Sequence, residues 1–393
     1  MESKNIKVAL VHDWYLSNSI SGAERVTLQL DKIISSNFST PDLYALTENI
    51  SNTNNKLFKG RNIYTSFLQK IPFGKNNIQK FLTFIPFAIE QLDLTQYDLI
   101  LSSSHIGAKG VLSSPDQLHI SYIHTPMRYA WDQMSTYLKK SKISRYGMEW
   151  AIRYFLFKLR QWDVYSSTRP DYLIANSTFT ARRIKKYWGL NAEIIYPPVN
   201  IKRFDCNQTR ENFYLTVSRL VPNKRVDILV NAFNNLNLPL YIVGEGPEKI
   251  NLKNSANNNI KFIKNNTDSN IEKLLSRCRA FVYAGIEDFG ITPVEAMASG
   301  APVIALKRGG ILDTINCLND SNKKKVPTGI LFNQQTSSDI FDTVQWFESK
   351  KLWERFNSQD INQYSNKFND ERFNSEFENF INKSSELFRN KLI

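Results

Sequence analysis

Short apolar runs alternate with longer spans of helical character along the whole chain, and this alternation limits the possible folds more than any other feature of the sequence. Strands that alternate with helices at this spacing form a parallel sheet with helices on both faces. The predicted strands are Lys7–Val11, Leu43–Leu46, Leu99–Ser102, His119–Ile123, Tyr172–Ala175, Glu193–Tyr196, Phe213–Val217, Leu238–Val243, Ile260–Ile263, Phe281–Ala284, Val303–Leu306 and Ile330–Phe332. We therefore predict an α/β protein built from doubly wound, Rossmann-like sheets.

The length of 393 residues is long for one such domain and sufficient for two buried cores. Pro197 and Pro198 form a stiff connection, because proline cannot continue a helix and biases the residue before it towards extended geometry. We predict an N-terminal domain at residues 1–198, a C-terminal domain at 199–369, and a helix at 370–393 that packs back on the first domain.

The composition is that of an ordinary globular protein, with 42% hydrophobic and 22% charged residues. The first apolar run, Val8–Val11, is much shorter than the core of a secretory signal, and no apolar stretch is long enough to cross a bilayer. The three cysteines, Cys206, Cys278 and Cys317, lie far apart, which makes a disulfide framework or a zinc site improbable. We expect a cytoplasmic protein.

The four histidines do not indicate a metal site either. None of them forms a helical His-x3-His pair, and His119 and His124 lie five residues apart on a predicted strand, which places them on opposite faces. We predict no metal and no other cofactor.

Basic and aromatic residues are interleaved in residues 51–90, in a chain whose net charge is +13. The cations there are Lys56, Lys59, Arg61, Lys70, Lys75 and Lys80, and the aromatic residues are Phe58, Tyr64, Phe67, Phe73, Phe81, Phe84 and Phe87. Such a mixture suits an anionic membrane surface and a peripheral location. A solvated face whose aromatic rings turn into the core remains the alternative. Nucleic acid is not predicted, because no nucleic-acid-binding motif is present.

Glu287 and Glu295 stand on either side of a glycine turn and a predicted helix start. The residues that would offer backbone N–H groups to a phosphate there, at the positive end of the helix dipole, are Asp288, Phe289, Gly290 and Ile291. Glu287 would then bind hydroxyls of a sugar and Glu295 those of a ribose. In the alternative interpretation, Thr292 to Glu295 form a capping box that serves only the helix.

Further candidate residues follow other predicted strands. Arg219 and Lys224 lie in a strand-to-helix loop, where two cations would stabilise a diphosphate leaving group, although a solvated basic loop has the same composition. Gly22 precedes the first helix and would let the backbone approach a phosphate. Gly244 and Gly246 would allow close approach of a base or ribose, or simply form a tight turn.

His124 ends the predicted strand His119–Ile123 and is expected to face a cleft between the domains. A histidine at a strand end is otherwise more often structural than catalytic. His105 is the second candidate, as part of an acceptor site or as a cap of the following helix.

Together these motifs resemble glycosyltransferase family 4, whose members have the GT-B fold of two Rossmann-like domains facing a cleft. The resemblance rests on the Glu-x7-Glu pattern, the strand Ala280–Ala284 before it and the segment Ala296–Ala305 after it. It implies that Glu287 lies by the transferred hexose and Glu295 by the nucleotide ribose. The spacing of Arg219 and Lys224 is similar to the diphosphate-binding pair of the family, and His124 would contact the sugar and stabilise positive charge at its anomeric carbon.

Two segments resemble a subgroup of bacterial mannosyltransferases that build O-antigen and related surface polysaccharides from GDP-mannose. These segments are Val11–Trp14 and His124–Asp132. The resemblance implies transfer of mannose to a growing, lipid-linked glycan with retained anomeric configuration and without an obligatory metal. A nucleotide-sugar epimerase of the same fold and a non-catalytic glycan-binding or membrane scaffold remain the alternatives.

Overall fold

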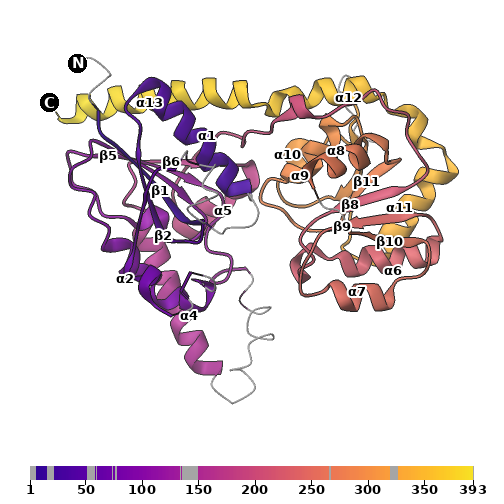
Figure 1. Ribbon diagram of the computed structural model, residues 1–393, viewed down its shortest axis with the longest axis horizontal. Helices are drawn as coiled ribbons and strands as arrows, with labels where there is room; N and C mark the ends of the chain where they lie inside the picture. Colours follow the sequence, from indigo (N-terminus) through magenta and orange to yellow (C-terminus); the bar gives the residue numbers. More distant parts are fainter. Residues whose placement is uncertain are drawn as a thin grey trace. The chain divides into compact units, whose positions relative to one another are not determined.

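The computed structural model describes residues 6–15, 22–50, 58, 60–72, 74, 75, 78–132, 134, 149–264, 267–318 and 326–392. The chain divides into two compact units, the first comprising Met1–Tyr196 with Phe373–Ile393 and the second Pro197–Arg372. Both units carry helices and a parallel sheet (Figure 1). None of the helices in the described part of the chain combines the length and apolar character of a bilayer-crossing segment.

The first unit contains a seven-stranded parallel sheet in the order β3-β2-β1-β4-β5-β6-β7. Its strands are β1 (Val8–Tyr15), β2 (Asp42–Glu48), β3 (Ile63–Thr65), β4 (Leu99–Ser104), β5 (Leu118–Ile123), β6 (Tyr172–Ala175) and β7 (Glu193–Ile194). The short strand β3 was not predicted, and β7 is shorter than predicted. All residues of β1, β4 and β5 are buried, as expected for central strands of a parallel sheet.

The helices of the first unit cover this sheet and complete its core. They are α1 (Gly22–Asn37), α2 (Ile85–Glu90), α4 (Glu149–Ser166), α5 (Thr178–Trp188) and α13 (Asp370–Leu392), with the 3-10 turns η2 (Phe67–Lys70), η3 (Ile78–Phe84) and η4 (Ala108–Gly110). The last helix, α13, buries Phe373, Phe377 and Ile381 among side chains of β1, β2 and α1. Asn374 also accepts a hydrogen bond from Gln29 of α1, 2.7 Å long.

The second unit contains a six-stranded parallel sheet in the order β10-β9-β8-β11-β12-β13. Its strands are β8 (Tyr214–Val217), β9 (Leu240–Val243), β10 (Ile260–Ile263), β11 (Ala280–Tyr283), β12 (Val303–Leu306) and β13 (Gly329–Phe332). Its helices are α6 (Val226–Leu236), α7 (Lys249–Ser255), α8 (Asp268–Arg277), α9 (Ile291–Ala298), α10 (Ile311–Thr314), α11 (Ser337–Ser349) and α12 (Ser358–Ser365), with the 3-10 turns η6 (Ile201–Arg203), η7 (Pro222–Lys224), η8 (Leu352–Arg355) and η9 (Asn366–Phe368). Figure 1 shows α8, α9 and α10 on one face of this sheet and α6 and α7 on the other.

Each sheet has a point at which the strand order reverses. This point lies between β1 and β4 in the first unit and between β8 and β11 in the second. Ligands of open α/β sheets bind outside the carboxyl ends of the strands at such a switch point. The loops that follow these four strands are therefore the places to look for functional side chains.

Candidate active site

The switch point of the first unit is organised by Asp13, a fully buried carboxylate of β1. Its two oxygens accept four backbone N–H groups of the turn that follows β4, from His105, Ile106, Gly107 and Ala108, at 2.6 to 3.0 Å. Burial alone would raise the pKa of Asp13, but the charge and hydrogen bonds of His105 lower it well below the usual range. Asp13 therefore stays ionised and holds this turn against the sheet.

His12 and His124 belong to one buried hydrogen-bond network with Thr27 and Ser103. His12 Nδ1 donates to the Ser103 carbonyl at 2.9 Å. The Thr27 hydroxyl donates to Ser103 Oγ at 2.8 Å, and Ser103 Oγ lies 2.8 Å from His124 Nε2. Ser103 Oγ therefore links the hydroxyl of Thr27 to the ring of His124.

Both of these histidines are uncharged at neutral pH. Burial, followed by the neighbouring His105, lowers the pKa of His12 to about 4. Burial, followed by His12 and His105, lowers the pKa of His124 well below its usual value. His124 is thus a neutral ring with a fixed orientation, and it keeps 8% of its surface exposed.

His105 is the more accessible candidate, with a side chain 24% exposed and Nδ1 2.8 Å from Asp13 Oδ2. Its ring meets Trp14 edge to face at 4.5 Å and lies 5.7 Å from the ring of His12. The structure therefore brings the two predicted histidines, His105 and His124, to the same cluster. Gly22 is the first residue of α1, which follows β1, and residues 16–21 before it lie outside the described part of the chain.

The switch point of the second unit brings together two predicted residues that are distant in sequence. Lys224, at the end of the turn after β8, forms an ion pair with Glu287, in the loop after β11. The hydroxyl of Tyr283, the last residue of β11, donates to the same carboxylate oxygen, Oε1. Both charged side chains remain about one fifth exposed, so the pair lies at the surface of the sheet edge.

Arg219 lies on the same loop as Lys224, and its side chain is exposed. Its guanidinium makes no ion pair or hydrogen bond with another described residue. Two glycines in the turn after β9 contact the backbone of this loop. A Cβ on Gly244 would lie 1.9 Å from the Ser218 carbonyl oxygen, and a Cβ on Gly246 would lie 2.3 Å from the Leu220 carbonyl oxygen. Gly244 and Gly246 therefore let this turn pack against the backbone on both sides of Arg219.

The predicted phosphate cradle, Asp288 to Ile291, leads directly into α9. Gly290 caps this helix with a left-handed backbone (φ 100°), which glycine adopts without strain. The backbone N–H groups of Gly290 and Ile291 donate to no other residue among those described. The alternative capping box is wrong, because the N-cap is Gly290 rather than Thr292, and Glu295 is consequently the fifth residue of the helix.

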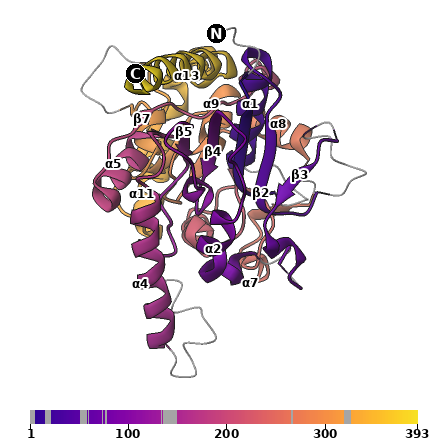
Figure 2. The same cartoon turned by 90° about the vertical axis from the view of Figure 1, so that its left-hand side faces the viewer.

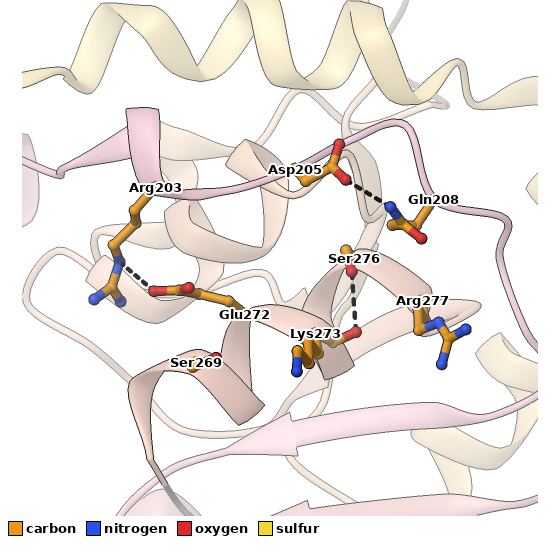
Figure 3. A pocket seen from close by; sticks show the side chains of 8 residues that line it. All are labelled: Arg203, Asp205, Gln208, Ser269, Glu272, Lys273, Ser276 and Arg277. Carbon is orange, nitrogen blue, oxygen red and sulfur yellow. Dashed lines mark hydrogen bonds and ion pairs between the residues drawn. The ribbon is translucent and has the colours of Figure 1, made fainter.

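Glu295 is a buried carboxylate that is neutralised by Arg203. Arg203 Nη2 donates to Glu295 Oε1 at 3.0 Å, and the same guanidinium lies 3.2 Å from Asp268 and 3.5 Å from Glu272. Arg203 also borders a polar pocket of about 520 Å³ between the segment after η6 and helix α8 (Figure 3). The pocket is lined by Arg203, Asp205, Gln208, Ser269, Glu272, Lys273, Ser276 and Arg277, so Lys224 and Glu287 are not part of it.

Four residues that take part in these groups were not predicted from the sequence: His12, Asp13, Tyr283 and Arg203. A charged residue inside a buried parallel strand is a detectable signal, and Asp13 shows it. Arg203 offers no local signal, because its partner Glu295 lies 92 residues away. No cluster of metal-binding side chains was found among the residues that the structure describes.

Comparison with sequence families gives two adjoining matches. Residues 20–203 match the family described as Glycosyltransferase Family 4, and residues 200–367 match the family described as Glycosyl transferases group 1. Together the two matches cover most of the chain, and they meet close to Pro197 and Pro198.

Similar curated proteins include an uncharacterized glycosyltransferase of Methanocaldococcus jannaschii, 27% identical over 206 residues that cover 49% of this chain and 58% of the relative. The alpha-1,3/1,6-mannosyltransferase ALG2 of Saccharomyces cerevisiae is 26% identical over 42% of this chain and 44% of its own. A GDP-mannose-dependent phosphatidylinositol monomannoside mannosyltransferase of Corynebacterium glutamicum is 29% identical over 38% and 47%, respectively. The chain thus spans about half the length of the curated relatives it matches.

Among solved structures, HepE of Anabaena in complex with UDP is similar with a TM-score of 0.66, 15% identity and coverage of 96% of this chain and 100% of HepE. Sucrose-phosphate synthase of Thermosynechococcus elongatus is similar with a TM-score of 0.67, 14% identity and coverage of 96% and 98%. At this level of identity the likeness concerns the fold, and it confirms the predicted GT-B architecture.

Proposed function

We propose, from the premise that this chain belongs to glycosyltransferase family 4, that it transfers mannose from GDP-mannose to a growing, lipid-linked surface glycan with retained anomeric configuration. The observation that carries the proposal is the contact between Lys224 and Glu287 at the switch point of the second unit. A cation for a diphosphate and a carboxylate for sugar hydroxyls meet there beside the N-terminus of α9.

In this proposal the second unit binds the donor. Arg219, Lys224 and the N–H groups at the start of α9 hold the diphosphate, and they stabilise the negative charge that develops as it leaves. Glu287 accepts hydrogen bonds from hydroxyls of the hexose, and Glu295, oriented by Arg203, accepts them from the ribose. The positive charge that faces the diphosphate comes from Arg219 and Lys224 on the loop after β8. Glu287, on the neighbouring loop after β11, fixes the position of Lys224.

The reaction that we propose needs no covalent intermediate with the protein. The bond between the anomeric carbon and the diphosphate oxygen breaks, and the acceptor oxygen attacks the same face of the sugar. The acceptor proton passes to a diphosphate oxygen, so that the products are GDP and the extended glycan. His124, which is held by a hydrogen bond with Ser103, contacts the sugar in this proposal and stabilises the positive charge at its anomeric carbon.

The choice of donor rests on likeness in sequence. Two of the relatives above carry mannosyltransferase names, and one of these names includes GDP-mannose. Solved structures of the same fold include complexes with UDP, so the base has to be decided by measurement. A thermal-shift screen of GDP-mannose against UDP-glucose and UDP-N-acetylglucosamine tests this choice, and stabilisation by the UDP sugars alone would contradict it.

The acceptor and the location belong to the same proposal. The name of the Corynebacterium glutamicum relative describes a mannosyl acceptor built on phosphatidylinositol. We extend this to a lipid-linked acceptor, with the enzyme bound peripherally to the cytoplasmic face of an anionic membrane. Transfer to a short, water-soluble analogue of the acceptor separates the chemistry from membrane binding.

Replacing His124 by alanine is expected to lower kcat by about 100-fold with little change in the KM for the donor, because its contribution arises in the transition state. His119→Gln is the matched control, since His119 is buried on the neighbouring part of β5 and bonds to Ser102 instead of Ser103. Steady-state kinetics of the two folded variants makes the comparison. Near-normal turnover by His124→Ala would move the proposed role to His105.

Replacing Lys224 by alanine is expected to weaken GDP binding by about 1.5–3 kcal/mol, because one charge-assisted hydrogen bond to the diphosphate is lost. Glu287→Gln should behave differently: it releases Lys224 from its ion pair, so GDP binding should hold or improve while transfer falls. Lys350→Ala, at an exposed lysine after α11, is the control. Calorimetry with GDP, beside turnover, tests both effects, and parental GDP binding by Lys224→Ala would remove Lys224 from the site.

A further inference from the structure

Helix α4 exposes a row of aromatic side chains that has no part in the proposed reaction. Trp150 is 72% exposed, Tyr154 52%, Phe157 44% and Tyr165 70%. Their spacing of four, three and eight residues places all four on one side of an α-helix. We call this row the aromatic face of α4. A protein surface rarely leaves so many large rings in contact with water without a binding partner.

The opposite side of α4 is anchored in the first unit, which fixes the aromatic face outward. Leu156 and Leu159 are buried in the core. Asp163 is fully buried and accepts hydrogen bonds from Lys109, Trp131 and Trp188 at 2.8 to 2.9 Å. Figures 1 and 2 both show the first turns of α4 extending away from the sheet of the first unit.

Positive charge accompanies the aromatic face. Lys158 Nζ lies 5.7 Å from the ring centroid of Tyr154 and 5.8 Å from that of Phe157. Arg153 is exposed on the same helix, where it pairs with Glu149. The sequence just before α4 contains Lys139, Lys140, Lys142 and Arg145, with no acidic residue between 135 and 148, and this segment lies outside the described residues. Within the described structure, Lys158 places positive charge beside the rings of Tyr154 and Phe157.

This combination matches the chemistry of an anionic lipid headgroup layer. Tryptophan and tyrosine place an apolar ring at the level of the headgroups while their polar atoms stay hydrated. Lysine and arginine beside them bind lipid phosphates, and their aliphatic stems cover apolar surface. A second copy of this chain would cover the rings but would bring the same positive charge against it, which argues against self-association.

We propose that the aromatic face of α4 is the surface through which the protein binds an anionic phospholipid bilayer. The sequence placed such a surface at residues 51–90. There the structure buries Phe58 and pairs Arg61 with Asp31. It leaves exposed Tyr64, Phe84, Phe87, Lys70, Lys75 and Lys80, and Lys56, Lys59 and Phe73 lie outside the described residues. The inference builds on the proposed membrane-linked acceptor, but vesicle binding is measured without any transfer reaction.

The test is sedimentation with vesicles of phosphatidylglycerol and phosphatidylethanolamine, compared with phosphatidylcholine vesicles. The triple variant Trp150→Ser, Tyr154→Ser, Phe157→Ser should lose binding to anionic vesicles by about tenfold or more. Ile250→Ser is the control, because Ile250 is 71% exposed in the second unit. Transfer to the short, water-soluble acceptor should stay at the parental level in both variants, so a failure of this inference leaves the proposed function standing.

A spectroscopic measurement locates the contact directly. Brominated anionic lipids should quench tryptophan fluorescence of the parent, and Trp150→Phe should abolish most of this quenching while retaining binding. Four outcomes would overturn the proposal. The first two are parental binding by the triple variant and equal binding of the parent to neutral and anionic vesicles. The third is loss of binding in the double variant Phe84→Ser, Phe87→Ser but not in the triple variant. The fourth is that the parent sediments even without vesicles and the triple variant does not, which would indicate self-association.

Discussion

Lowering the pH from 7.5 to 5 will destabilise the first unit by about 4 kcal/mol or more, because the unit buries histidines in their neutral form. Burial, followed by His105, lowers the pKa of His12 to about 4, and burial, followed by Arg169, lowers that of His119 to about 3. His124 is lowered in the same direction. In the unfolded chain these rings take up a proton near pH 6.5.

The direction of the effect follows from the number of protons that each state binds. Between pH 6.5 and about 4 the unfolded state is protonated at these positions and the folded state is not, so the free energy of unfolding falls as the pH falls. His12 and His119 each contribute about 2 kcal/mol at pH 5. Asp13 does not oppose this loss, since its pKa is lowered and it remains ionised throughout this window.

Amide hydrogen exchange of peptides from β1, β4 and β5, measured at several pH values and corrected for the intrinsic exchange rate, reports on the first unit alone. Protection should fall steeply below pH 6.5. In His119→Gln the free energy of unfolding of the first unit should depend less steeply on pH, because one fewer proton is taken up on unfolding. Protection that is independent of pH between 7.5 and 5 would show that these rings are not buried in the neutral form.

Replacing Asp13 by alanine will destabilise the first unit by about 3–5 kcal/mol, because a buried charged group is removed while its partners remain buried. Four backbone N–H groups between His105 and Ala108 would lose their acceptor. Asp13→Asn should cause a loss of similar kind, since an amide offers only one acceptor oxygen. The same exchange measurements, applied to residues 104–112, should show the turn after β4 opening first.

Asp98→Ala is the matched control for Asp13, because Asp98 is an exposed aspartate directly before β4 of the same sheet and accepts one backbone N–H, from Lys7 at 2.9 Å. Its loss should cost about 1 kcal/mol. If Asp13→Ala were no more destabilising than Asp98→Ala, the turn that carries His105 would be held by other contacts, and Asp13 would not organise the switch point.

The sequence predicted the central strands well because they are short, apolar and separated by helical spans. The two edge strands were harder to predict: β3 has only three residues, none of them buried, and β7 has two exposed residues. Such strands carry no periodic pattern, and their pairing depends on neighbours that are remote in sequence.

Lys224 and Glu287 were each predicted as site residues, whereas the contact between them was not predicted. The ion pair of Lys224 with Glu287 joins loops that are 63 residues apart, and only the adjacency of β8 and β11 brings them together. The helix starts at Ile291, as the predicted phosphate cradle requires, and only the alternative capping box fails. Thr292 and Glu295 have the spacing of a capping box, but Gly290 already provides the left-handed cap.

Retaining transfer of mannose is tested by following GDP release from GDP-mannose, with and without a lipid-linked glycan acceptor, while the anomeric configuration of the product is read by NMR. We expect GDP to form in step with mannosylated product, the product to keep the configuration of the donor, and neither to form without acceptor. Conversion of the donor in the absence of acceptor, or turnover of UDP sugars but not of GDP-mannose, would contradict the proposed function.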